Sequence, residues 1–144
     1  MYFNVIKGFN LSSSWNDYIP ISYYDLLTPY QRKNSYTIVM KEKNNTFIGI
    51  ARLAYISKNI MYLCDVFLME PYRGKYYKEI KYSHLLLNKV MNIINNRTCY
   101  LEVHKKNKAA ISLYRHFGFI DYSDQGKLLN LPDTQTMIYM NSSI

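Results

Sequence analysis

The apolar and polar residues follow a clear pattern between positions 99 and 119. They first alternate, as they do in a strand with one buried face. The apolar residues of this strand are Cys99, Leu101 and Val103. Apolar residues then recur at helical spacing, at Ala110, Leu113, Tyr114 and Phe117. Asn107 can accept a hydrogen bond from the first amides of that helix, and Gly118 can end it in a left-handed conformation. The stretch therefore predicts a strand, a polar turn, a short helix and a glycine stop.

The same kind of pattern predicts the elements in the rest of the chain. Strands are expected at residues 2–9, 36–40, 46–55, 60–68, 119–122 and 136–140. Residues 12–27 predict a helical region that Pro20 interrupts, and residues 28–34 predict a loop. An amphipathic helix is expected after Gly74, with an apolar face of Ile80, Leu86, Leu87, Val90, Met91, Ile93 and Ile94. We therefore expect a mixed α/β sheet in a single domain spanning residues 1–144.

The composition narrows the class of protein. Hydrophobic residues make up 49% of the chain and aromatic residues 16%, which argues against a disordered protein. The chain does not begin with a basic segment followed by an apolar core, and no apolar run is long enough to span a bilayer. A cytoplasmic protein with no membrane partner is therefore expected. Cys64 and Cys99 have no metal-ligand spacing, so buried free thiols and no metal site are expected.

Several residues at fixed offsets resemble a known family. The residues LEV at 101–103, Asn107, Ala110, the Leu-Tyr pair at 113–114 and the Gly-Phe pair at 118–119 resemble the second signature block of the GNAT N-acetyltransferase superfamily. The nearest likeness within it is to the RimI-type enzymes, which acetylate protein amino termini. This resemblance implies the α+β GNAT acyl-CoA N-acyltransferase fold, a mixed and mostly antiparallel sheet flanked by helices. It also implies acetyl-CoA as the acyl donor.

The resemblance implies a cofactor loop in front of the amphipathic helix. In the family this loop reads Q/R-x-x-G-x-G/A, and its backbone amides hold the pyrophosphate of acyl-CoA. Here it corresponds to residues 73–78, in which Tyr76 and Lys78 replace the two small residues. The leucine pair that follows comes about one turn later than in the family, which indicates an insertion within residues 76–82. The cofactor-binding residues implied are Leu68, Met69, Arg73, Gly74, Lys75, Tyr76, Tyr77, Lys78, Asn107 and Tyr114.

The charge agrees with a cofactor of this kind. Lys and Arg outnumber Asp and Glu by 18 to 10, which gives a net charge of +8. Such an excess favours a negatively charged partner, either nucleic acid or a phosphorylated cofactor. The basic residues form two clusters, Arg73, Lys75, Lys78 and Lys81 in one and Lys105, Lys106, Lys108 and Arg115 in the other. Both clusters border the predicted cofactor site, so the cofactor is favoured over nucleic acid.

Acyl transfer to an amine requires a base, a donor for the oxyanion and an acid for the leaving thiolate. Tyr114 matches the family's acid, and a phenol with an ordinary pKa of about 10 can protonate a thiolate of pKa about 8.5; the alternative is a core tyrosine. Glu102 matches the RimI-type base, with a solvent-facing strand residue as the alternative. Asp65 and His104 are rival bases. The oxyanion donor would be a backbone amide near Leu68 or Met69. The two remaining histidines, His84 and His116, show no partner in the sequence.

These residues predict acetyl transfer from acetyl-CoA to a primary amine. Direct attack in a ternary complex is expected, because no cysteine occupies a nucleophile position. A protein amino terminus, a small-molecule amine and aminoacyl-tRNA all stay open as acceptors, and either a monomer or a homodimer is expected. The alternative is a GNAT-fold module that has lost catalysis and binds nucleic acid through its lysines. The altered loop at residues 73–78 is the reason for that alternative.

Overall fold

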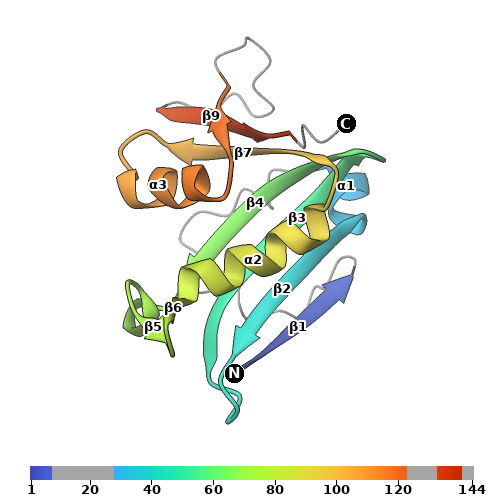
Figure 1. Cartoon of the computed structure of the whole chain (residues 1–144). Helices are drawn as coiled ribbons and strands as arrows, with labels where there is room; N and C mark the ends of the chain where they lie inside the picture. The colour runs from blue at the N-terminus through green and yellow to red at the C-terminus, as the bar shows by residue number, and fades with distance from the viewer. Residues whose placement is uncertain (8–27, 123–132, 141–144) are drawn as a thin grey trace.

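The computed structural model describes residues 1–7, 28–122 and 133–140 (Figure 1). Within them one sheet has the strand order β1-β2-β3-β4-β7-β9-β8. The strands are Tyr2–Lys7 (β1), Ser35–Lys41 (β2), Phe47–Ser57 (β3), Ile60–Leu68 (β4), Thr98–His104 (β7), Ile120–Asp121 (β8) and Thr134–Tyr139 (β9). The α-helices in this described part of the chain are Pro29–Lys33 (α1), Tyr82–Ile94 (α2) and Lys108–His116 (α3). Two further short strands, Tyr76–Tyr77 (β5) and Ile80–Lys81 (β6), pair in a separate hairpin. The helical region expected at residues 12–27 lies outside the described residues.

The sheet is mixed and mostly antiparallel, as predicted. Strands β1 to β4 form an antiparallel meander in which each strand pairs with the next. Strand β7 pairs with β4 in parallel, and β9 then pairs with β7 and β8 in antiparallel fashion. The long connection from β4 to β7 contains the hairpin and α2, as a parallel crossover requires. One sheet therefore joins the two halves of the described chain.

The two parallel strands separate part of the way along. Strands β4 and β7 pair only from Ile60 to Leu63 on one side and from Thr98 to Leu101 on the other. Beyond these residues β4 stays with β3, β7 stays with β9, and Figure 1 shows the two strands diverging. The register of β3 and β4 shifts directly after Leu63, and such a bulge bends a strand. We call the opening beyond Leu63 and Leu101 the fork.

Helix α2 lies across one face of the sheet (Figure 1). Its buried residues are Tyr82, Leu86, Leu87, Val90 and Ile94. They pack in one cluster with apolar side chains of β2, β3, β4 and β7. Burial of each large aliphatic side chain contributes about 1.5–3 kcal/mol, so this face holds the helix on the sheet. The same cluster includes Ile111 and Tyr114 of α3. Of the predicted apolar face, Leu86, Leu87, Val90 and Ile94 are thus confirmed as buried residues of α2.

Two predictions of local structure are wrong. The loop expected at residues 28–34 contains α1, which begins at Pro29 after Thr28. The Thr28 hydroxyl accepts a hydrogen bond from the Gln31 amide, while the Gln31 side chain accepts one from the Thr28 amide. This capping box with proline in the first turn is a helix-start signal. The second error concerns Ile80, which lies in β6 and is exposed, so it is not part of the apolar face of α2.

Both cysteines are buried free thiols, as the sequence predicts. Cys64 lies on β4 and Cys99 on β7, and each is at most 4% exposed. Burial raises the pKa of the Cys64 thiol, and the neighbouring Asp65 raises it further. Burial also raises the pKa of the Cys99 thiol. Neither group is therefore suited to act as a nucleophile at neutral pH, because only the thiolate attacks.

Candidate active site

A hairpin interrupts the loop that leads from β4 into α2. The chain passes from the short 3-10 turn Glu70–Tyr72 through Gly74, which has a positive φ of 68°, and then enters β5 and β6. The Tyr82 amide donates a hydrogen bond to the Lys75 carbonyl at 3.1 Å, which brings the two ends of the hairpin together. The insertion expected within residues 76–82 is thus a β-hairpin.

Closing the hairpin restores the spacing of the loop. When Tyr76–Lys81 are set aside, Arg73, Gly74 and Lys75 lead directly into Tyr82, Ser83 and His84. This run has the length of the Q/R-x-x-G-x-G/A motif, with Tyr82 and His84 at the two positions of small residues. Leu86 then follows Arg73 by about two helical turns, as in the motif. The loop therefore continues at the start of α2, and Tyr76, Tyr77 and Lys78 belong to the insertion.

The start of α2 can attract an anion. Its N-cap residue is Lys81, which makes no side-chain cap hydrogen bond, and its first turn contains no acidic residue. The first amides of a helix have no partner within the helix, and the helix dipole places partial positive charge there. Ser83 and His84 of this turn line the cleft described next. This helix end therefore has the property that phosphate-binding helices use.

A cleft of about 530 Å³ lies between α3, the start of α2 and the end of β4. Its lining residues are Leu68, Arg73, Gly74, Lys81, Ser83, His84, Ala109, Ala110, Ser112, Leu113 and His116. Arg73 and Lys81 bring positive charge, and this described lining contains no Asp or Glu. The Arg73 side chain is held in place, since its Nε donates to the Leu68 carbonyl at 2.8 Å and its guanidinium lies 5.1 Å from the centre of the Phe67 ring.

Two histidines that showed no partner in the sequence meet in this cleft. The rings of His84 on α2 and His116 on α3 stack with centroids 4.6 Å apart and an interplanar angle of 23°. The ring of Phe117 is steeply inclined to both, with its centroid 5.4 Å from that of His84 and 5.2 Å from that of His116. Burial lowers the pKa of His84, and His116 and Lys81 lower it further. The pattern of single residues could not predict this pair, because it depends on how α2 and α3 are placed.

The two candidate carboxylates stand on opposite arms of the fork. Glu102 directly follows Leu101 on β7 and is buried, so the solvent-facing alternative is wrong. It accepts hydrogen bonds from the hydroxyls of Thr136 at 2.7 Å and Thr134 at 3.1 Å, both on β9. Asp65 follows the last paired residue of β4 by two positions and is also buried. Its Oδ2 lies 3.9 Å from Nη1 of Arg52, with both side chains 3% exposed.

One of the two predicted oxyanion donors is already engaged. The Met69 amide donates to the Ile48 carbonyl at 2.8 Å, so it points toward β3. Successive amides of a strand point toward opposite edges, so the Leu68 amide points away from β3, toward the fork. The Leu68 carbonyl lies on the same edge and accepts the hydrogen bond from Arg73. Leu68, which also lines the cleft, is therefore the better placed of the two donors.

Tyr114, Asn107 and His104, the other predicted site residues, are absent from the residues that line the cleft. Tyr114 is 8% exposed and packs against Phe119, next to Leu113 in the cleft lining. Asn107 caps α3, since its side chain accepts a hydrogen bond from the Ala110 amide at 3.1 Å. Its cap function is confirmed, and its contact with the cofactor stays a prediction. His104 is exposed, and its Nδ1 accepts a hydrogen bond from the Lys106 amide at 3.2 Å.

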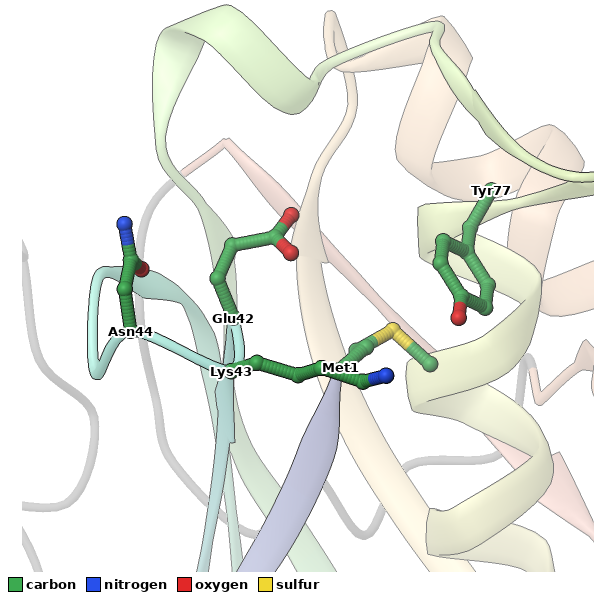
Figure 2. Close-up of a pocket in the computed structure, with 5 residues that line it drawn as sticks. All are labelled: Met1, Glu42, Lys43, Asn44 and Tyr77. Carbon is green, nitrogen blue, oxygen red and sulfur yellow. The ribbon is translucent and has the colours of Figure 1, made fainter.

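The hairpin borders a second hollow, away from the cleft (Figure 2). This hollow has a volume of about 410 Å³, and Figure 2 shows its lining residues Met1, Glu42, Lys43, Asn44 and Tyr77. Beside it, the Tyr82 hydroxyl donates to the Glu42 carboxylate at 3.4 Å. The rings of Tyr77 and Tyr82 lie 6.1 Å apart. Burial raises the pKa of Tyr82, and Glu42 raises it further. Tyr82, the first residue of α2, thus contacts both the hairpin residue Tyr77 and the turn between β2 and β3.

Neither a metal cluster nor a membrane span is found in the described part of the chain. Among the described residues, no group of three or more His, Cys, Asp or Glu side chains is placed to hold a metal ion. The helices within residues 28–122 are all too short or too polar to cross a membrane.

The chain belongs to the acetyltransferase (GNAT) family, whose model matches residues 9–119. This covers most of the chain and includes the loop, α2, the fork and α3. The expected GNAT fold is thereby confirmed, while nothing specifically indicates the RimI type. No curated protein sequence matches the chain closely enough to count as a relative.

Solved structures share the fold at low sequence identity. A GNAT acetyltransferase from Staphylococcus aureus Mu50 superposes with a TM-score of 0.67 at 17% identity, covering 96% of this chain and 98% of that one. A variant of the spermidine N-acetyltransferase SpeG from Vibrio cholerae has a TM-score of 0.56 at 19% identity, covering 76% and 67%. The PaiA N-acetyltransferase of Thermoplasma acidophilum, in complex with coenzyme A, has a TM-score of 0.53 at 22% identity, covering 74% and 59%.

The contact between Thr136 and Glu102 predicts a loss of stability on substitution. Thr136→Val removes the hydroxyl that donates at 2.7 Å and leaves one oxygen of a buried carboxylate without this donor. We expect the free energy of unfolding to fall by about 1–3 kcal/mol, measured by urea denaturation. Thr136→Ser keeps the hydroxyl and is the matched control. Equal stability of the two variants would show that the hydroxyl does not stabilise Glu102.

Proposed function

We propose that the protein transfers an acetyl group from acetyl-CoA to a primary amine, with the phosphates of the donor in the cleft and the reacting groups at the fork. One observation carries this proposal: the closed hairpin brings Arg73 and Gly74 beside the uncapped start of α2, in a cleft with cationic side chains. Leu68 lines that cleft and ends the β4 arm of the fork. The cofactor cleft and the fork therefore share Leu68 as a common residue.

The residues at the fork supply groups for each part of an acyl transfer. The Leu68 amide, on the edge of β4 away from β3, can donate a hydrogen bond to a developing oxyanion. Glu102 and Asp65, one on each arm, can accept the proton of an amine directly or through a water. Tyr114, beside the cleft on α3, can donate a proton to the leaving thiolate as it forms, because a phenol of ordinary pKa about 10 still carries its proton at neutral pH. Bound acetyl-CoA would supply the activated thioester.

The acceptor we propose is an amine that carries positive charge. Two buried carboxylates flank the fork, one on each strand, and the Arg52 guanidinium lies beside Asp65. A cationic acceptor would gain a favourable interaction with Glu102 in a site of low dielectric constant. Small polyamines and protein amino termini both satisfy this requirement. The solved structures that share the fold include a spermidine N-acetyltransferase, which is consistent with the first of these.

The large residues at the two small-residue positions of the motif favour a competing function, that of an inactive binding module. Tyr82 and His84 stand at these positions, where the backbone of the family's loop comes close to the phosphates. A GNAT-fold module that has lost catalysis would tolerate such residues. Cofactor binding therefore separates the two functions.

We expect coenzyme A and acetyl-CoA to bind with measurable heat in a calorimetric titration. The cationic cleft and the start of α2 provide the physical reason. The double variant Arg73→Gln/Lys81→Gln should bind more weakly by about tenfold or more, because two positive charges are lost. Lys33→Gln, on α1 and outside the cleft lining, is the charge control. Absence of binding at millimolar ligand would sink the acetyltransferase proposal in favour of the inactive module.

Tyr114→Phe tests the proposed acid. We expect kcat to fall by about 10²–10⁴-fold with little change in the affinity for coenzyme A, since the phenol acts on the leaving group only. Turnover is followed by the release of free thiol with a polyamine or a peptide as acceptor. The control is Leu113→Met, which preserves an apolar cleft wall of similar volume beside the tyrosine. Unchanged turnover of Tyr114→Phe would remove Tyr114 from this function.

Comparing Glu102→Gln with Asp65→Asn identifies the base. Loss of the true base should lower kcat/KM by about 10²–10⁴-fold and should remove the acidic limb of its pH profile. The other variant should keep that limb. Thermal unfolding of both variants is measured in parallel, because Asp65→Asn leaves the Arg52 guanidinium buried without its carboxylate. A folded pair of variants that both keep the rate and the limb would exclude both residues.

A further inference from the structure

The stacked histidines connect two helices across the proposed cofactor cleft. His84 is the third residue of α2, and His116 is the last residue of α3. Their rings lie 4.6 Å apart, and both residues line the cleft. The Phe117 ring packs nearly perpendicular to both imidazoles, at 86° to His84 and 78° to His116. The pair therefore forms a polar part of the cleft wall.

The charges around the pair have one sign. Arg73 comes from the loop after β4, and Lys81 precedes α2; both line the same cleft. The described lining offers no carboxylate to either imidazole. Arg115, which precedes His116 on α3, has its own partner in Asp121 at 2.9 Å. The surroundings thus lower the pKa of His84 in the free protein, and they favour a ligand with several negative charges.

We propose that His84 and His116 bind the phosphate groups of the coenzyme A donor and take up protons as the donor binds. This inference rests on the proposed function, because it assigns the phosphate end of that donor to the cleft. A protonated imidazole donates charge-assisted hydrogen bonds to phosphate oxygens. A histidine replaces the small residue of the loop motif at position 84, so the chain gains a side-chain contact where the motif provides a close backbone contact.

The coupling between protons and the ligand has a definite direction. Burial, His116 and Lys81 lower the pKa of His84 in the free protein. Bound phosphates would favour the charged form and raise that pKa. Between the lower value of the free protein and the higher value of the complex, binding therefore takes up protons, and affinity increases as the pH falls. Above the higher value the His84 imidazole is neutral in both states, and below the lower value it is charged in both, so the coupling disappears.

Calorimetry measures this proton uptake directly. Coenzyme A is titrated into the protein at about pH 6.5 in two buffers with different ionisation enthalpies, and the difference in heat gives the number of protons bound. We expect wild type to take up more protons than His84→Gln/His116→Gln, and we expect the double variant to bind about tenfold more weakly at this pH. At about pH 8.5 the affinities of the two proteins should converge, because neutral imidazoles lose the charge-assisted contact.

Two controls isolate the histidine pair. His104→Gln removes the remaining histidine of the chain, which lies outside the cleft lining, so its proton count on binding should equal that of wild type. Dephospho-coenzyme A removes the terminal phosphate monoester, which itself titrates near pH 6. The difference between wild type and the double variant should persist with this ligand, because the diphosphate also carries negative charge.

The outcomes separate this inference from the proposed function. Equal proton uptake by wild type and the double variant, with coenzyme A bound to both, would overturn the inference and leave the acetyltransferase proposal intact. Failure of wild type to bind coenzyme A would overturn both. If the double variant does not fold, the imidazole resonances of wild type are titrated by NMR with and without coenzyme A. Higher pKa values for His84 and His116 in the complex would support the inference, and unchanged values would overturn it.

Discussion

The parting of β4 and β7 is the constraint on which the rest of the structure depends. A sheet normally satisfies the backbone groups of an inner strand on both edges. Here β4 keeps β3 on one edge and loses β7 beyond Leu63, while β7 keeps β9 and loses β4 beyond Leu101. The facing edges of the fork therefore offer backbone groups that no strand engages, such as the amide of Leu68, whereas the Leu68 carbonyl accepts its hydrogen bond from Arg73. A ligand with peptide-like groups can bind to such edges as a strand would.

The connection between the two arms determines what else can reach the fork. It must cross from the end of β4 back to the start of β7, and α2 makes that crossover on the face of the sheet that bears the large apolar cluster. This places the start of α2 at the open end of the fork, beside Arg73 and Gly74. The hairpin is tolerated because the bond from the Tyr82 amide to the Lys75 carbonyl closes it before the helix begins. An insertion within the helix itself would rotate its buried face away from the sheet.

The sequence predicted the elements whose signals are local and missed the contacts that depend on packing. The cap at Asn107 and the stop at Gly118 depend on neighbouring residues, and the structure contains both. The family motif predicted an insertion, but not that it forms a hairpin, because β5 and β6 have only two residues each. His84 and His116 are far apart in the chain, and their stacking follows from where α2 and α3 lie on the sheet. The burial of Glu102 depends likewise on β9, whose threonines reach it from the neighbouring strand.

The distribution of polar groups over the two faces of the sheet bears on how the site can work. One face carries the apolar cluster under α2 and α3, while Glu102, Asp65 and Arg52 are buried on strands that also contribute to it. Buried charges are costly unless other groups compensate them; here threonine hydroxyls donate hydrogen bonds to Glu102, and the Arg52 guanidinium forms an ion pair with Asp65 at 3.9 Å. Glu102 alternates along β7 with Leu101 and Val103 of the cluster, so its side chain leaves the strand on the face opposite the helices. A donor that enters from the helix side and an acceptor that enters from the carboxylate side would come together at the fork without competing for the same surface.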